Sequence, residues 1–292
     1  DLTPPAGPVA PTMKPLDVVE PRLPLTQETA PGDADSVFRI TRPGSYYLVG
    51  DVVGEPGKHG VFILTDGAVT LDLSGFSLRG APGARSGVLG ALYSAAAVRN
   101  GMVLDWPLDG LDMDTAGSGG VRLESLQVVN NGGRGASLGF FSIVRGCAFS
   151  LNGEVGLAVQ HGSIVESCSA VGNGEGFSLA SASTIRDCLA SSNAGPGFVL
   201  RGRSVAENNF ATNHSLGPGF RTMGVGNTLR GNVATGNQNG FVVQGEGNTV
   251  LSCVSTGSAG EEFVIAPNNA VAPRLTTADL AVTPIPFANI TD

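Results

Sequence analysis

The sequence has few charged residues, few aromatic residues and no long uninterrupted apolar segment. Of its 292 residues, 14% are charged, 6% are aromatic and 43 are glycine. With so much glycine and no heptad pattern, a helical protein is not expected, and short apolar runs between turn residues favour many short strands. Because no stretch approaches 18 consecutive apolar residues, no membrane-spanning helix is expected. These features predict an all-β protein that does not insert into a membrane.

Basic residues are also scarce. Lys and Arg number 17 against 25 Asp and Glu, which gives a formal net charge of −8. Nucleic-acid binding depends on clustered cations that neutralise phosphates, so no nucleic-acid partner is expected. The chain opens with "DLTPPAGPVAPTMK", which has neither a basic n-region nor an apolar h-region. We therefore expect an export signal to have been removed already, and the protein to be secreted, extracellular or at the cell surface.

A repeat dominates the second half of the sequence. In each unit, alternating apolar positions are followed by an Asn about ten residues in, then by Gly-Phe and a Val or Leu. The period of 20–23 residues is too short for helical-pair repeats, and the Leu spacing of leucine-rich repeats is missing. Segments 61–80, 98–113 and 121–138 fit as earlier, more divergent units. The clearest units begin at Ser142, Ser163, Ser183, Ser204, Asn227 and Asn248.

This pattern predicts a single-stranded, right-handed parallel β-helix, a solenoid of about nine rungs with 20–23-residue coils. The β-helix is placed at residues 36–267. Residues 1–35 contain eight prolines and are predicted to be an extended N-terminal arm. Residues 268–292 are predicted to form an extended C-terminal tail or cap.

Equivalent positions in successive units form columns of structural residues. The charged column alternates in sign, as expected for neighbouring strands that attract each other. All four cysteines share one column, where they are expected to be small buried thiols, and a third column consists of turn asparagines that can hydrogen-bond from rung to rung. The charged column contains Arg99, Glu124, Arg145, Glu166, Arg186, Glu207 and Arg230; the other two contain Cys147, Cys168, Cys188 and Cys253, and Asn152, Asn173, Asn193 and Asn237.

The segments "ITRPGSYYLVGDV", "GVFILTDGAVTLDLSGFSLRG" and "VRNG", with the serial Asn-x-x-Gly-Phe-x-Val coils, resemble secreted bacterial right-handed parallel β-helix repeat proteins of the pectate-lyase-like superfamily. The resemblance covers about residues 36–290. It implies the fold, whereas functions in this superfamily range from lyases and hydrolases to adhesins. The signatures of polygalacturonase-like enzymes are missing apart from His161-Gly162, so no catalytic residues are assigned.

The remaining candidate site is the acidic segment "LDWPLDGLDMD" at 104–114. Asp105, Asp109, Asp112 and Asp114 are candidate Ca²⁺ ligands, and Trp106 is a candidate platform for a sugar ring. No other cofactor is expected. Arg201, Arg203 and Arg221 follow the Phe column and are candidates for a small anion-binding edge.

Two functions are compatible with these features. The leading hypothesis is a secreted, non-enzymatic structural protein that self-associates into a filament or surface assembly through its terminal arm and its β-helix ends. The alternative is a β-helix protein that binds or cleaves an extracellular polysaccharide, as a lyase or hydrolase. Of the two classes, the non-enzymatic one is favoured by the missing catalytic signatures.

Overall fold

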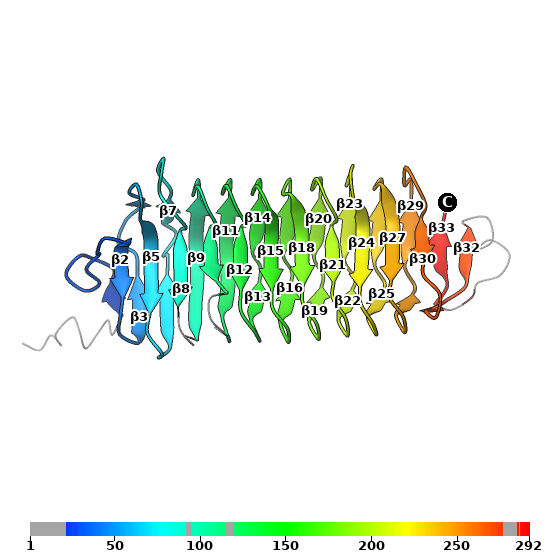
Figure 1. Cartoon of the computed structure of the whole chain (residues 1–292), viewed down its shortest axis with the longest axis horizontal. Helices are drawn as coiled ribbons and strands as arrows, with labels where there is room; N and C mark the ends of the chain where they lie inside the picture. The colour runs from blue at the N-terminus through cyan, green and yellow to red at the C-terminus, as the bar shows by residue number, and fades with distance from the viewer. Residues whose placement is uncertain (1–21, 92–94, 115–118, 277–284, 286) are drawn as a thin grey trace, which may run out of the picture.

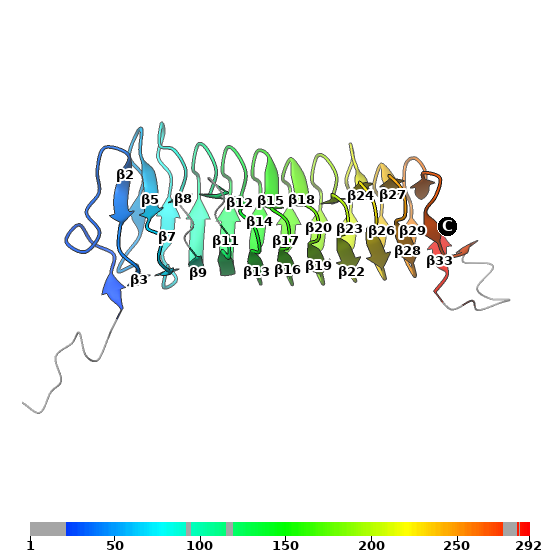
Figure 2. The ribbon, with the colours of Figure 1, turned by 60° about the horizontal axis from the view of Figure 1, so that its bottom comes forward.

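The protein is a long rod of stacked coils (Figures 1 and 2). The structure is a computed structural model that describes residues 22–91, 95–114, 119–276, 285 and 287–292. The coils wind right-handed into a parallel β-helix of about 12 turns, so the predicted fold class is confirmed and the predicted nine rungs were too few. The described residues include no helix long and apolar enough to cross a membrane.

One wall of the rod is a parallel sheet, here called sheet B, which takes one strand from each coil. Every strand pairs with the corresponding strand of the coils before and after it, without a break in register. Its strands are β2 (Ser36–Ile40), β5 (His59–Leu64), β8 (Val88–Ala91), β10 (Leu111–Met113), β12 (Ala136–Leu138), β15 (Val155–Val159), β18 (Glu175–Leu179), β21 (Phe198–Leu200), β24 (Pro218–Met223), β27 (Asn239–Gln244) and β30 (Phe263–Ile265).

The rest of each coil belongs to a second sheet, sheet A, which is bent lengthwise into two rows. The first row contains β1 (Leu23–Pro24), β3 (Gly44–Tyr47), β6 (Val69–Asp72), β13 (Ile143–Arg145), β16 (Ile164–Glu166), β19 (Thr184–Arg186), β22 (Val205–Glu207), β25 (Thr228–Arg230), β28 (Thr249–Leu251) and β31 (Ala270–Val271). Strands β9 (Ala96–Leu104) and β11 (Arg122–Val129) run through both rows. The second row continues with β4 (Val52–Val53), β7 (Ser77–Arg79), β14 (Ala148–Ser150), β17 (Ser169–Val171), β20 (Leu189–Ser191), β23 (Phe210–Thr212), β26 (Val233–Thr235), β29 (Val254–Thr256), β33 (Asn289–Thr291) and the neighbouring β32 (Arg274–Thr276).

Each regular coil turns at three corners, and each corner is a single residue with left-handed backbone. In the coil that begins at Ser142, these residues are Gly146 and Leu151, with Gly162 closing the coil; their φ values are 58°, 57° and 74°. The residue after each corner is buried and belongs to a column of polar or thiol side chains. The sharp bends therefore place one polar side chain per corner inside the rod, where it must find a partner in the adjacent coil.

The asparagine column supplies these partners. The backbone N–H and the side-chain Nδ2 of Asn152 both donate to Oδ1 of Asn173, at 3.0 and 2.8 Å, and Asn173 donates in the same way to Asn193. The next member is His214, whose Nδ1 lies 3.2 Å from the backbone N of Asn193, and whose own backbone N–H donates to Asn237. The neighbouring Asn213 is the corner residue itself, with a φ of 59°.

The cysteine column lies at the bend between the two rows of sheet A. All four cysteines are free and buried. Asn209 and Asn232 occupy the column between Cys188 and Cys253, and they accept the backbone N–H of the preceding coil as the Asn column does. Asn289 of the C-terminal strand β33 accepts from the backbone N of Cys253 at 2.9 Å. The C-terminal residues thus continue this column over the last regular coil.

The charged column runs along the outer surface of sheet A. The strand register pairs Arg99 with Glu124, and continues through Arg145, Glu166, Arg186, Glu207 and Arg230. Glu166 forms ion pairs with both Arg145 and Arg186, and Arg230 forms one with Glu207 at 2.6 Å. Glu124 instead lies 3.7 Å from Arg122 on its own strand. These carboxylates are occupied by neighbouring guanidinium groups along the rod.

Strand pairing continues at both ends of the predicted β-helix segment. Residues 1–21 of the predicted arm lie outside the described residues. Within the arm, β1 pairs with β3 and so belongs to the first row of sheet A. At the other end, β31 continues that row past residue 267 by pairing with β28. Strand pairing therefore extends beyond the predicted limits of 36 and 267.

The rod interior contains a stack of phenylalanine rings beneath sheet B. Phe177, Phe198, Phe220, Phe241 and Phe263 are stacked in successive coils, with centroids 4.7–5.2 Å apart and nearly parallel planes. Phe198 is wholly buried, whereas Phe210 on the outside of sheet A is 40% exposed. The two side chains belong to nearby strands, β21 of sheet B and β23 of sheet A, but lie in opposite environments.

This contrast gives a test of the core. Phe198→Ala is expected to lower the free energy of unfolding by about 3–5 kcal/mol, because it leaves a cavity in the stack. Phe210→Ala, the control, is expected to cost less than about 1 kcal/mol. Denaturant unfolding followed by circular dichroism measures both changes, and equal losses would contradict the assignment of the stack as the core.

Candidate functional site

The outer surface of sheet B contains a groove that crosses several coils. It has a volume of about 400 Å³ and runs over β12, β15 and β18. The register pairs Ser137 with Ala158, and Ala158 with Ser178, so one small outward residue from each coil forms the floor. Arg134 and Glu175 line one side, and Asp114, Gln160 and Arg201 line the other. The groove therefore has a small-residue floor and polar walls.

Hydrogen bonds fix the walls to the floor and to each other. Nη1 of Arg134 donates to the hydroxyl of Ser137 at 3.0 Å, and Nη1 of Arg201 donates to the hydroxyl of Ser178 at 2.6 Å. Both serines are buried at the base of the groove. Two guanidinium groups from opposite walls are thus anchored on the groove floor, and that of Arg201 keeps further N–H donors for a ligand.

The end of the groove nearer the N-terminus is acidic. Asp112 precedes Ser137 in the floor column, since the two pair in register, and Asp114 lies two residues farther along. Asp109 accepts the backbone N–H of Arg134 at 2.7 Å. Arg134 also lies 3.4 Å from Glu154. At this end, carboxylates outnumber the single guanidinium.

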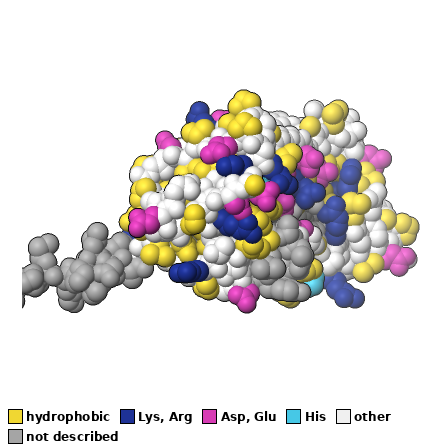
Figure 3. Space-filling model, turned by 60° about the vertical axis from the view of Figure 1, so that its left-hand side comes forward, with side chains coloured by type: hydrophobic (Ala, Val, Ile, Leu, Met, Phe, Trp, Pro, Cys, Tyr) yellow, Lys and Arg dark blue, Asp and Glu magenta, His cyan; other side chains and the backbone are white. Residues whose placement is uncertain are grey.

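The other end of the groove is basic. No described carboxylate lies within ion-pair distance of Arg201. Arg221 follows on the neighbouring strand, paired with Val199, and its buried Nε has no hydrogen-bond partner. In the view of Figure 3, acidic and basic side chains lie close together on one flank of the rod, so that flank does not present a field of one sign. Arg201 and Arg221 are cations without described counter-ions.

Partial burial changes the acidity of two of the carboxyls. Desolvation raises the pKa of Asp109, although the backbone N–H of Arg134 acts in the opposite direction. Desolvation likewise raises the pKa of Asp112, and the nearby charge of Asp114 adds to the increase. A carboxyl with a raised pKa is better suited than an ordinary one to hold or transfer a proton near neutral pH.

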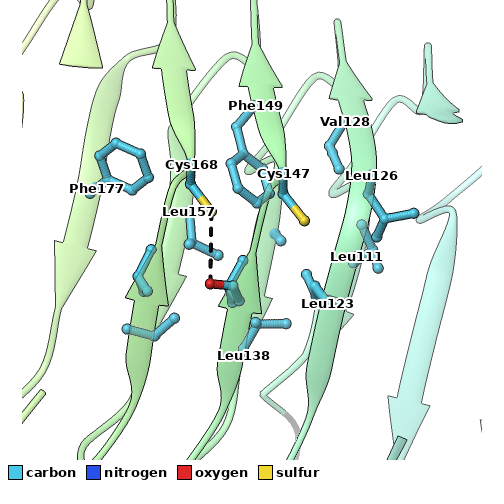
Figure 4. Packing of buried hydrophobic residues seen from close by; sticks show 14 of the residues in the cluster. Leu111, Leu123, Leu126, Val128, Leu138, Cys147, Phe149, Leu157, Cys168 and Phe177 are labelled. Carbon is cyan, nitrogen blue, oxygen red and sulfur yellow. Dashed lines mark hydrogen bonds between the residues drawn. The ribbon is translucent and has the colours of Figure 1, made fainter. Parts of the chain in front are cut away.

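A second hollow of about 550 Å³ lies at the bend of sheet A, along the cysteine column. It is lined by Cys147, Cys168 and Cys188, among other residues, but the three side chains are only 2–3% exposed. Figure 4 shows Cys147 and Cys168 lying among the core leucines and phenylalanines. Burial raises the pKa of Cys253 to about 11, which keeps this thiol protonated. Buried thiols without a described catalytic base are not a nucleophilic site.

The structure does not gather the four predicted metal ligands. Asp105 lies at a corner with a φ of 62°, where it accepts from Asn130 and lies 3.8 Å from Arg79. Asp109, Asp112 and Asp114 belong to the outer surface of sheet B instead. Among the described residues, no group of three or more His, Cys, Asp or Glu side chains is arranged to hold a metal ion. The proposed calcium ligands therefore do not form one site.

Trp106 cannot serve as a sugar platform, because its side chain is wholly buried. Its Nε1 donates to the carbonyl of Leu78 at 3.0 Å. Three glycines, Gly54, Gly60 and Gly87, make room for the indole. A β-carbon at any of these positions would come within 2.9 Å of the ring. Those three glycines are the sequence signal that the tryptophan points inward.

The sequence-based interpretation missed most of the groove. It grouped Asp112 and Asp114 as metal ligands and Arg201 and Arg221 as part of an anion-binding edge, without joining the two groups. It did not single out Arg134, Gln160 or Glu175. The available signal was the outward position of each sheet B strand. There, Asp112, Ser137, Ala158 and Ser178 succeed one another one coil apart, and charged residues stand beside them.

Comparison with known proteins identifies the fold. Residues 94–221 match the family described as a right handed beta helix region. No curated protein matches the chain in sequence. The predicted resemblance to right-handed parallel β-helix proteins is confirmed.

Three solved structures are similar to about four fifths of the chain. The mannuronan C-5 epimerase AlgE4 A-module of Azotobacter vinelandii has a TM-score of 0.61 at 14% identity, over 82% of this chain and 78% of that one. A mutant of the periplasmic alginate epimerase AlgG has a TM-score of 0.52 at 12% identity, over 81% and 69%. The Dettilon tailspike protein has a TM-score of 0.50 at 12% identity, over 82% and 60%. At these identities the similarity shows the fold alone.

The raised pKa values lead to a test of the acidic end by pH. A carboxyl with a raised pKa in the folded state contributes stability below its unfolded pKa of about 3.9, and this contribution is lost as the pH rises through the folded pKa. Asp112→Asn is therefore expected to raise the melting temperature at neutral pH, with a difference that disappears in acid below the usual Asp range. Asp66 is exposed, so Asp66→Asn serves as a control and is expected to leave the melting temperature unchanged at both neutral and acidic pH. If Asp112→Asn has no effect at neutral pH, the desolvation of Asp112 is refuted.

Proposed function

We propose that this right-handed parallel β-helix protein binds an acidic polysaccharide in the groove on the outer surface of sheet B. The observation that carries the proposal is the position of Arg201. Its guanidinium is anchored to Ser178 on the groove floor and has no carboxylate partner among the described residues. A sugar carboxylate that accepts from its remaining N–H groups would supply the missing counter-ion.

The shape of the groove suits an extended chain. Its floor is made of one small residue from each of three consecutive coils, Ser137, Ala158 and Ser178, which keeps the surface low along the rod. Successive coils are about 4.8 Å apart. A polymer lying along the rod would thus meet similar floor positions coil after coil, with hydroxyl and guanidinium donors beside it.

Charge favours a carboxylate-bearing polymer over a neutral one. Arg201 supplies a cation at one end of the groove, and Arg221 supplies another one coil farther on. Two of the similar structures are described as epimerases of mannuronan or alginate, which are polymers of uronic acids. Their fold supports a polysaccharide as the ligand class of this chain, and their substrates suggest the probe to use.

We propose accordingly that the protein works outside the cytoplasm, where such polymers occur. The epimerase AlgG is described as periplasmic. The earlier hypothesis of a self-assembling filament subunit is not supported by these comparisons and is not carried further.

Binding of alginate provides the test. Wild-type protein is expected to bind alginate oligosaccharides in isothermal titration calorimetry, with an affinity that falls as salt is added, because the contact is ionic. Arg201→Ala is expected to weaken binding by about tenfold or more, since a hydrogen bond to a charged group contributes about 1.5–3 kcal/mol.

Arg230→Ala is the matched control, because Arg230 is also an exposed arginine at the end of a strand but lies on sheet A, paired with Glu207. It is expected to leave the affinity unchanged. The proposal is wrong if wild-type protein binds no alginate, or if both arginine substitutions weaken binding equally.

A second candidate function is proton transfer on the bound polymer. The raised pKa of Asp112 and its position beside Arg134 favour this candidate, since a lyase or epimerase must move a proton next to a neutralised sugar carboxylate. If it is correct, wild-type protein produces unsaturated ends or changes the uronate composition of alginate, and Asp112→Asn lowers that rate at least about 100-fold. Absorbance of unsaturated products and NMR of the polymer measure the two outcomes. Unchanged alginate would leave binding as the function.

A further inference from the structure

Three aromatic rings meet at one corner of the rod, where Phe141 and His161 are exposed and Phe140 is half-buried. The ring centroid of His161 lies 4.7 Å from that of Phe140 and 5.1 Å from that of Phe141, and the Phe141 ring is edge-on to the imidazole. Phe141 is 62% exposed. These three residues, called here the aromatic corner, lie where sheet B turns into the first row of sheet A, just after β12 and β15.

The fold does not require an aromatic residue at this position. Phe141 is a corner residue with a φ of 55°, a conformation that is unfavourable for a bulky side chain. Coil after coil, the equivalent corner is occupied by other residue types, namely Gly162, Ala182, Arg203, Gly226, Gly247 and Asn268. The Phe141 side chain does not compensate for this conformation by burial, because most of its surface faces solvent.

The next coil is shaped to support the ring. A β-carbon at Gly162 would come within 2.6 Å of the Phe141 ring, so the ring lies directly over a glycine. The backbone N–H of Phe141 donates to the carbonyl of His161 at 3.0 Å, which ties the two coils together here. An exposed aromatic residue in a strained conformation, placed over a glycine of the next coil, indicates a role outside folding.

The aromatic corner adjoins the groove. Gln160 lines the groove and immediately precedes His161. Its Nε2 donates to Asp114 at 2.7 Å, two coils away, and the coil between them has Gly139 at this position, directly before Phe140. The missing side chain at Gly139 leaves room for Gln160 to reach Asp114. The groove wall and the aromatic rings are therefore consecutive residues on the same two coils.

We propose that the aromatic corner is a second subsite of the groove, where the exposed Phe141 ring stacks against the apolar C–H face of a sugar ring of the bound polysaccharide, with Phe140 and His161 beside it. This inference rests on the proposed function, because it assigns the groove's ligand a further contact. One face of a pyranose ring carries C–H groups, which suit an aromatic surface, while its carboxylate and hydroxyls suit the guanidinium and amide groups of the groove. The subsite therefore selects for sugar rings, whereas Arg201 selects for charge.

The test uses Phe141→Gly, which places at this corner the residue that occupies it at positions 162, 226 and 247. The variant removes a strained side chain, so it is expected to fold. Leu151→Gly is the matched control: Leu151 is also a corner residue, with a φ of 57° and 61% exposure, and it lies over Gly172 as Phe141 lies over Gly162. It belongs to the corner between sheet A and sheet B, away from the aromatic rings.

Both variants and the wild type are titrated with alginate oligosaccharides, after circular dichroism has verified their fold. Phe141→Gly is expected to weaken binding by about tenfold while the salt dependence stays unchanged, because the lost contact is uncharged. Leu151→Gly is expected to bind as the wild type does. Equal affinity of Phe141→Gly and wild type overturns the subsite and leaves the proposed function standing.

Two other results also overturn the inference. If wild-type protein binds no oligosaccharide, both the proposed function and the subsite are wrong. If Phe141→Gly leaves binding unchanged but alters self-association in sedimentation velocity, the aromatic corner is a protein contact and not a sugar platform.

Discussion

Hydrogen bonding from each coil to the next is the constraint on which the rest of this structure depends. A rod with one strand per wall per coil can satisfy its backbone only through the coils above and below, so the register cannot shift along its length. The three left-handed corners bring polar residues into the interior at fixed places, and these residues also bond from coil to coil. Asn152 donates its backbone and side-chain N–H groups to Asn173, and Asn173 donates in the same way to Asn193. Any position on the outer surface is thereby repeated about every 21 residues, which is how distant parts of the sequence form one groove.

The same constraint explains how much could be predicted. A repeating register makes the alternation of Arg145, Glu166 and Arg186 visible in the sequence, and it identifies the buried cysteine and asparagine columns before any coordinates are known. The prediction was wrong where the repeat is irregular. Trp106 follows a corner in the loop between two sheets, and its inward direction depends on space left by Gly54, Gly60 and Gly87, two of them more than 40 residues away. The substitution of His214 for an asparagine was missed because a chemically different ring occupies the same place.

The groove could not be predicted for a related reason. Each of its residues looks unremarkable in its own coil, since Arg134, Gln160 and Arg201 are ordinary outward side chains when considered singly. They form a site only because the coils stack. Arg134 and Arg201, on opposite walls, donate to Ser137 and Ser178 of the floor, and Arg221 lies one coil beyond Arg201, with no described counter-ion for either. The ladder on sheet A has similar residue types, but there each carboxylate of the best-formed part contacts an arginine, which leaves little for a ligand. The charges on the two outer surfaces of the rod are thus differently compensated, which is why we propose the sheet B surface as the binding surface.

The central claim is that an acidic polysaccharide occupies the groove on sheet B. Chemical modification of arginines by a dicarbonyl reagent, read by mass spectrometry with and without alginate, tests it most directly because both surfaces of the rod report at once. The account predicts that alginate protects Arg134, Arg201 and Arg221, while Arg145, Arg186 and Arg230 on sheet A react as before. Protection of the sheet A arginines alone, or of none, would contradict it.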